Sequence, residues 1–121
     1  MAPQISEKTF HTGTIDIHYA EGPENGPAVV LLHGGSANWQ YCRGLIEVLG
    51  VHWHVFAPDL RGHGKSGRVP WGYSVRAFAE DIGAFLQQVS GPAALFGHSL
   101  GGVVMVTRWI SSCQPCSVRS C

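Results

Sequence analysis

The hydrophobic and polar positions of this 121-residue chain change their period several times between the two ends. Residues 9–22, TFHTGTIDIHYAEG, alternate weakly between apolar and polar. The apolar face comprises Ile15, Ile17 and Tyr19, and the polar face comprises Asp16 and His18. A period of two predicts one or two short antiparallel strands, with a turn at Gly13.

Two short apolar runs, AVVLL at 28–32 and AALF at 93–96, have no polar side chain in alternate positions. Between them, the segment 52–59 is predicted to be another short strand, which ends at Pro58. The first follows the turn-forming cluster GPENGP at 22–27. Strands that are buried on both faces have this pattern, and such strands belong to parallel sheets.

Helical periodicity separates and follows these runs. Residues 38–49 and 74–90 place apolar side chains three and four positions apart, and residues 100–110 continue the pattern after the last strand. Ser74 is a suitable N-cap for the second helix, which Gly91 and Pro92 end. Strand and helix alternating from residue 28 onward predict an α/β fold with a mostly parallel sheet and flanking helices. Functional sites in such sheets lie at the carboxyl ends of the strands.

One serine lies at such an end. The stretch LFGHSLGG at 95–102 contains the pattern G-x-S-x-G around Ser99, directly after a predicted strand and before a predicted helix. A chain that turns this sharply brings the residues two before and two after the serine close together, so glycine suits Gly97 and Gly101. A Gly/Ser turn at a helix start is the simpler reading of the motif alone. Its context favours an exposed nucleophile at Ser99.

A second motif, His33-Gly34-Gly35, follows the first buried strand. Acyl transfer requires two backbone N–H groups directed at the oxyanion that develops in the transition state. The residue after the nucleophile and the loop after an earlier strand commonly supply them, which points to Leu100 and Gly35. We expect His33 to be structural and, with Gly34, to support this loop.

The stretches LLHGGSANW, PDLRGHGKS and LFGHSLGG together resemble the N-terminal portion of the α/β-hydrolase fold family, of the serine esterase and lipase-like kind, over residues 8–110. The resemblance implies a nucleophile at Ser99, an oxyanion hole formed by Gly35 and Leu100, and a structural loop at 59–64. Family members that open epoxides carry aspartate at the nucleophile position. A serine favours attack on the carbonyl group of a small ester or related compound, through an acyl-enzyme intermediate.

No histidine, aspartate or glutamate follows Ser99, although the family order is nucleophile, acid, then histidine. After residue 110 the composition changes to the Ser/Cys-rich segment SSCQPCSVRSC. We therefore expect residues 1–110 to be the N-terminal part of a hydrolase domain truncated after the nucleophile-elbow helix, and 111–121 to be an atypical tail. Such a chain would be inactive alone. The alternative is a non-catalytic interaction fragment that retains the fold.

Composition limits the other classes of function. Eight basic and eight acidic residues balance, which gives no electrostatic basis for binding nucleic acid or an acidic membrane. The spacing of Cys113, Cys116 and Cys121 suits part of a zinc site, and reduced thiols in an unstructured tail are the alternative. Trp39 and Trp71 are candidates for lining an entrance to the site, although packing is the more common role of such residues. We expect no cofactor and no metal, a small-molecule substrate, self-association through an exposed sheet edge, and a cytoplasmic location.

Overall fold

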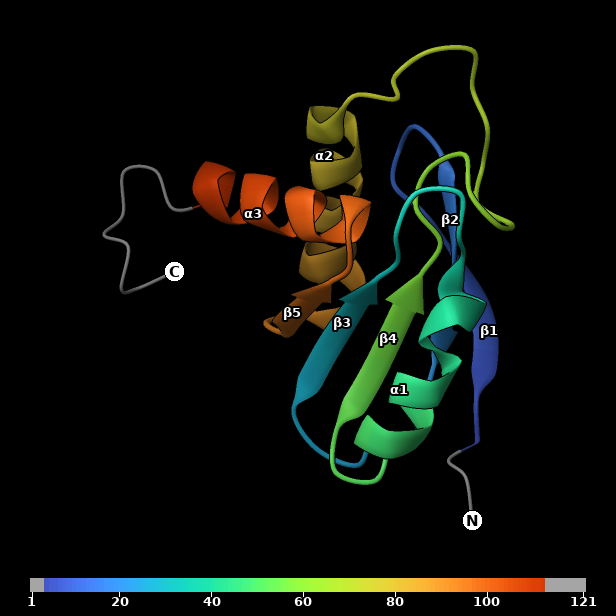
Figure 1. Cartoon of the computed structure of the whole chain (residues 1–121), viewed down its shortest axis with the longest axis vertical. Coiled ribbons are helices and arrows are strands. Elements are labelled where there is room, and N and C mark those ends of the chain that lie inside the picture. The colour runs from blue at the N-terminus through green and yellow to red at the C-terminus, as the bar shows by residue number, and fades with distance from the viewer. Residues whose placement is uncertain (1–3, 113–121) are drawn as a thin grey trace.

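A computed structural model describes residues 4–112 of the chain, with side chains placed through residue 108. One mixed sheet lies between a helix on one face and two helices on the other (Figure 1). In chain order the elements are β1 (Ser6–His11), β2 (Asp16–Glu21), β3 (Ala28–Leu32), the 3-10 turn η1 (Trp39–Cys42), α1 (Arg43–Leu49), β4 (His54–Pro58), α2 (Val75–Phe85), the π-helical turn η2 (Leu86–Ser90), β5 (Ala94–Gly97) and α3 (Leu100–Ser112).

The order of the strands across the sheet is β1-β2-β4-β3-β5. Strands β4, β3 and β5 are parallel neighbours, whereas β2 pairs antiparallel with both β1 and β4. Only β2 therefore runs against the other strands of the described sheet, which confirms the prediction of an α/β fold with a mostly parallel sheet. The carboxyl ends of β3 and β5 are adjacent, since Leu32 is in register with Gly97.

Strand β2 differs from its predicted pattern at one position. Ile15, Ile17 and Tyr19 are buried as expected, but His18 is buried as well. Its Nδ1 lies 3.0 Å from an Asp59 carboxylate oxygen and its Nε2 lies 3.0 Å from Glu7. A polar side chain with both ring nitrogens paired can be buried at low cost, which alternation alone does not reveal.

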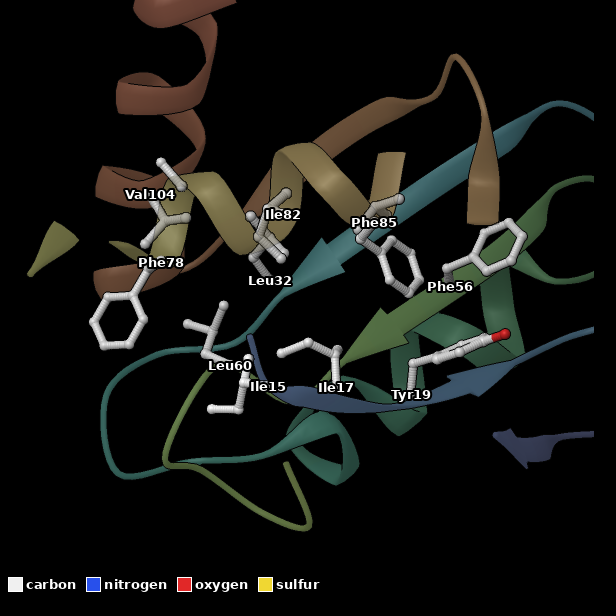
Figure 2. Close-up of a cluster of buried hydrophobic side chains, with 12 residues drawn as sticks. Ile15, Ile17, Tyr19, Leu32, Phe56, Leu60, Phe78, Ile82, Phe85 and Val104 are labelled. Atoms are coloured by element: carbon white, nitrogen blue, oxygen red, sulfur yellow. The ribbon is translucent and has the colours of Figure 1, made fainter. Parts of the chain in front are cut away.

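Two hydrophobic cores hold the helices against the sheet. Figure 2 shows the larger one, in which α2 packs on the side chains of β2, β3 and β4. Phe85 lies at its centre, edge-on to Tyr19 with the ring centroids 5.0 Å apart. The smaller core, on the opposite face, includes Trp39, Cys42 and Ile46 of η1 and α1.

The helix ends follow the capping residues of the sequence. Ser74 accepts a hydrogen bond from the Ala77 amide at 3.1 Å and begins α2, which confirms its role as N-cap. The predicted helix at 74–90 is α-helical only to Phe85 and ends in a π-helical turn before Gly91. The helix predicted at 38–49 likewise begins as a 3-10 turn. Side-chain periodicity does not distinguish these closely related helical forms.

Strand β5 forms one edge of the sheet, and the side chain of Phe96 is about half exposed there, at 48%. This edge matches the one expected from the sequence. An unpaired edge exposes backbone N–H and C=O groups that can bind another strand. Self-association through it stays a prediction.

A buried ion pair connects the loop after β4 to α2. Arg61 donates two hydrogen bonds of 2.9 Å to the carboxylate of Asp81 and a third, of 3.1 Å, to the Gly72 carbonyl oxygen. The bond to Asp81 raises the pKa of Arg61, so the guanidinium stays charged. Loss of the carboxylate would leave a buried charge whose remaining partner is the neutral Gly72 carbonyl group.

Substituting Asp81→Ala should therefore lower the free energy of unfolding by about 3–5 kcal/mol, the usual effect of breaking a buried pair. Glu80→Ala is the matched control, because Glu80 precedes Asp81 on α2, is exposed and pairs with the exposed Arg76 at 3.6 Å. Its loss should cost less than about 1 kcal/mol. Urea denaturation of both variants measures the difference, and equal values would contradict the structural role of Asp81.

Candidate active site

Ser99 lies between the end of β5 and the start of α3, where the chain reverses. Its φ of 55° is in the left-handed region, which non-glycine residues rarely adopt. The amide of His98 donates to the Leu32 carbonyl oxygen at 3.0 Å, and that of Gly101 donates to the His98 carbonyl oxygen at 3.0 Å. These bonds fix the turn on both sides of Ser99, which is exposed. The structure thus has the sharp strand-to-helix turn that the motif predicts.

The two glycines of the motif have backbone where a side chain would be. A Cβ at Gly97 would lie 2.5 Å from the Gly101 carbonyl carbon, and a Cβ at Gly101 would lie 2.6 Å from that of Leu32. Real Cβ atoms do not approach backbone so closely. The requirement for glycine at both positions is therefore steric, as the sequence predicts.

The loop after β3 lies against the same turn. A Cβ at Gly34 would be 3.4 Å from the Ser99 Cβ, and a Cβ at Gly35 would be 3.8 Å from a methyl group of Leu100. Leu100 is the first residue of α3, where an amide has no acceptor within the helix. Within residues 4–112, the amides of Gly35 and Leu100 donate no hydrogen bond. The two predicted oxyanion donors are thus neighbours with free N–H groups, and their role stays a prediction.

A cavity of about 580 Å³ opens beside Ser99. Its lining comprises Leu32, His33, Gly34, Gly35, Ser36, Ala37, Tyr41, Cys42, Leu45, Phe96, His98 and Ser99. Pockets of this size hold small organic ligands. No motif in the sequence marks Tyr41, Leu45 and Phe96 as cavity residues, because exposed aromatic and aliphatic residues also occur in ordinary amphipathic segments.

His33 is buried at the back of the cavity and has both ring nitrogens engaged. Its Nε2 accepts from the Leu60 amide at 2.9 Å, so its Nδ1 carries the hydrogen and donates to the Gly34 carbonyl oxygen at 2.6 Å. Burial lowers the pKa of His33, because desolvation disfavours the charged ring. These contacts fit the predicted structural role and leave no nitrogen to accept a proton.

The loop at 59–64 is held by the carboxylate of Asp59, which is 1% exposed. It accepts from the Trp39 amide at 2.7 Å and the Lys65 amide at 3.0 Å, and it pairs with His18. Asp59 thus ties the start of η1 to β2 and to its own loop. Its bonds fit the structural role that the resemblance implies for this segment.

The other histidines and tryptophans considered for the site differ in whether they line the cavity. The Nδ1 of His63 donates to the Arg61 carbonyl oxygen, and the ring lies near that of His33, outside the cavity lining. His98 does line the cavity beside Ser99. Neither Trp39 nor Trp71, which is 71% exposed, lines the cavity. Trp39 is buried in the smaller core, which is the packing role that the sequence analysis gives as the more common one.

Residues 4–112 contain no group of three or more His, Cys, Asp or Glu side chains placed to bind a metal ion. The cysteine-rich segment that includes Cys113, Cys116 and Cys121 lies outside the described residues, so the zinc hypothesis for it stays a hypothesis. No helix in the described part of the chain is long and apolar enough to cross a membrane.

The turn itself can be tested with two neighbouring glycines. Gly97→Ala should lower the free energy of unfolding by at least about 1–3 kcal/mol, as overpacking does, because the new methyl group meets backbone that cannot move aside. At Gly102 the nearest atom to an added Cβ is 3.4 Å away. Gly102→Ala should be neutral or stabilising by up to about 1 kcal/mol, since alanine favours a helix. Thermal unfolding of both variants checks this, and an unaffected Gly97→Ala protein would refute the close approach.

The lowered pKa of His33 predicts that the stability of the fold depends on pH. Since its pKa is lower in the folded than in the unfolded chain, the stabilising contribution is fully present above the unfolded value of about 6.5. It is lost progressively as the pH falls from that value through the lower, folded pKa. Glutamine at position 33 can still accept from the Leu60 amide but does not titrate. Between pH 7.5 and 5.5, wild-type protein should therefore lose more stability than His33→Gln protein. His52→Gln, at an exposed histidine, is the control, and an identical loss in both variants would contradict the prediction.

The chain is similar in sequence and in structure to several known proteins. The magnesium-chelatase 30 kDa subunit of Rhodobacter capsulatus is 38% identical over 96 residues, which are 78% of this chain and 34% of that protein. A soluble epoxide hydrolase of a Corynebacterium species is 33% identical over 82% of this chain and 36% of its own. The structure of a 2-hydroxy-6-oxo-6-phenylhexa-2,4-dienoate hydrolase from a Rhodococcus species superposes with a TM-score of 0.82, at 30% identity over 91% of this chain and 43% of that one.

The chain spans about a third of the length of the curated relatives it matches. Residues 27–107 match the family described as the alpha/beta hydrolase fold, and this match includes β3, the loop at 59–64, and the turn at Ser99. Two thirds of the chain therefore carry the family pattern. The chain belongs to the α/β-hydrolase fold family, whose members among its relatives include hydrolases.

Proposed function

We propose that Ser99 is the nucleophile of a serine hydrolase that acts on a small ester or a related carbonyl compound. The observation that carries the proposal is the position of Ser99, exposed at φ 55° on the wall of the cavity, beside the free amides of Gly35 and Leu100. Among the described residues that line the cavity, no other serine lies at the start of a helix. Ser36, the nearest alternative, lies in a loop.

The proposed reaction has two halves. Ser99 Oγ loses its proton to a general base and attacks the carbonyl carbon, and the C–O bond to the leaving alcohol breaks as that alcohol takes the proton. Water then hydrolyses the resulting acyl-serine ester. In each half the oxyanion would accept hydrogen bonds from the Gly35 and Leu100 amides, and one such donor contributes a factor of about 10²–10³ in rate. The amino-terminal end of α3 adds a favourable field.

The identity of the nucleophile supports a carbonyl substrate over an epoxide. A carboxylate that opens an epoxide forms an ester, which water can cleave. A serine hydroxyl that did the same would form an ether, which water does not cleave under mild conditions. The similarity to an epoxide hydrolase therefore concerns the family and its fold, and Ser99 favours acyl transfer here.

The mechanism also needs a general base, which in this family is a histidine that follows the nucleophile in the sequence. No histidine or carboxylate follows Ser99 in the sequence. His98 is adjacent, but neighbouring side chains diverge at a sharp turn. We therefore propose that the 121-residue chain alone hydrolyses esters very slowly. The proposal requires no cofactor, and the cytoplasmic location stays a prediction.

A thiol at position 99 removes the need for a base and tests the site directly. Cysteine forms thiolate without a histidine, and the helix amino terminus lowers its pKa. The new thiol of Ser99→Cys protein should thus be acylated by p-nitrophenyl acetate. Ser36→Cys is the matched control, because Ser36 is also exposed, has φ 61° and lines the same cavity, but lies in a loop. We expect acylation at least about tenfold faster at position 99 than at position 36, which is the modest end of an oxyanion-hole effect.

Peptide mapping of the acyl group separates position 99 from the native cysteines. Cys42 is an internal reference, since burial raises its pKa to about 11 and keeps its thiol neutral. Wild-type protein should show no turnover above that of Ser99→Ala protein. Equal acylation rates for the Ser99→Cys and Ser36→Cys proteins would contradict the proposed site and favour the non-catalytic interaction fragment.

A further inference from the structure

The cavity beside Ser99 and Gly35 is also lined by residues of η1, α1 and the edge strand β5. Its wall there consists of Tyr41 and Cys42 from η1, Leu45 from α1 and Phe96 from β5. We call these four residues the apolar wall. Phe96 is in register with Leu31, which belongs to the core beneath α1, so its ring lies on the α1 face of the sheet. The wall therefore faces one continuous space that Ser99 also borders.

No aspartate, glutamate, lysine or arginine is among the residues that line this cavity within the described part of the chain. The nearest basic residue on α1, Arg43, has its guanidinium 4.8 Å from the ring centroid of Trp39, a cation–π contact that holds it elsewhere. His33 has both nitrogens bonded to backbone. The Cys42 thiol is neutral because burial raises its pKa. His98 borders the same cavity, but it lies beside Ser99 and is not part of the apolar wall. A charged substituent in front of the apolar wall would lose its hydration and gain no ionic partner from the four residues of that wall.

We infer that the apolar wall binds an uncharged, apolar group of the substrate, adjoining the carbonyl carbon that Ser99 attacks. The inference rests on the proposed function for the position of that carbon. It assigns Leu45 the role of a specificity-determining residue, because its side chain is the part of the wall that α1 directs into the cavity and it is still accessible, at 38% exposure. A substrate with a carboxylate in that position is selected against.

Two features distinguish the wall from an ordinary exposed apolar surface. It adjoins the proposed nucleophile, and the space in front of it is a cavity of about 580 Å³, within the usual size for a small ligand. Val48, on the same helix, is more exposed at 71% but lines no part of the cavity. Leu45 and Val48 therefore form a matched pair that differs in access to the site.

The experiment measures binding through a reversible bond and does not need hydrolysis. Ser99→Cys protein is equilibrated with small disulfides of equal length whose transferred thiol ends in a methyl group, a carboxylate or an ammonium group, in the presence of 2-mercaptoethanol. Exchange joins the new thiol at position 99 to the thiol fragment and releases the fragment's former partner as a free thiol, so no other oxidant is needed. Mass spectrometry with peptide mapping gives the fraction of position 99 that carries each fragment.

The methyl-terminated fragment should remain at position 99 at a reductant concentration about tenfold higher than the carboxylate fragment tolerates, the scale at which apolar pockets discriminate. Adding Leu45→Lys should reverse this order by supplying a cation, whereas Val48→Lys, which adds the same charge outside the cavity, should leave it unchanged. Equal retention of the three fragments, or equal effects of the two lysines, would overturn the inference.

The two experiments distinguish a failure of this inference from a failure of the proposed function. Acylation of the Ser99→Cys thiol by an ester reports on the amides and on the position of that thiol, while retention of the disulfide reports only on the apolar wall. Fast acylation together with equal retention would overturn the apolar wall and preserve the nucleophile. Slow acylation with a preference for the methyl-terminated fragment would overturn the nucleophile and leave a binding site for apolar groups.

Discussion

The close approach of three backbone segments at the ends of β3 and β5 is the constraint on which the rest of this structure depends. Gly97 and Gly101 allow the strand to turn into α3 within one residue, and the turn rests on the carbonyl groups of Leu32 and His33. Because no side chain can be placed between these segments, Ser99 has one position relative to the loop after β3. The proposed nucleophile and the proposed oxyanion donors are consequently fixed by backbone, and backbone is less mobile than side chains.

This arrangement explains why several polar side chains are buried behind the site. Asp59, His18, Arg61 and Asp81 together connect β2, the loop after β4, η1 and α2 through hydrogen bonds of 2.7–3.1 Å. None of them borders the cavity. Asp59 bonds to the Trp39 amide, directly after the loop that follows β3 and borders the cavity. His33 bonds to backbone groups of that loop and of the loop after β4. Asp59 and Arg61 of the motif PDLRGHGKS therefore do not contact the cavity themselves. They stabilise the loops and the helix around it.

The parts of the molecule that the sequence predicts are those set by local backbone requirements. The strand at 28–32, the N-cap at Ser74 and the turn at Ser99 each depend on residues within a few positions of one another, and all three are present. The burial of His18 depends instead on Asp59 and Ser66, which are 41 and 48 residues away. Alternation placed His18 on the polar side of its strand, since the sequence does not reveal which distant partners reach it.

The residues of the cavity wall could not be predicted from the sequence either, because they too come together only in the folded chain. Tyr41, Leu45 and Phe96 come from a turn, a helix and an edge strand with no shared pattern, so the sequence does not distinguish them from packing residues. Motifs identify the groups that would act on the reacting carbonyl, because these must have fixed geometry and hence a fixed local sequence. The groups that contact the remainder of a substrate need only the right shape and polarity, and several residue types satisfy that. A cavity lined by no aspartate, glutamate, lysine or arginine among the described residues, beside an exposed serine, is therefore information that only the folded arrangement contains. It supports the proposed preference for an uncharged group, about which the family motif says nothing.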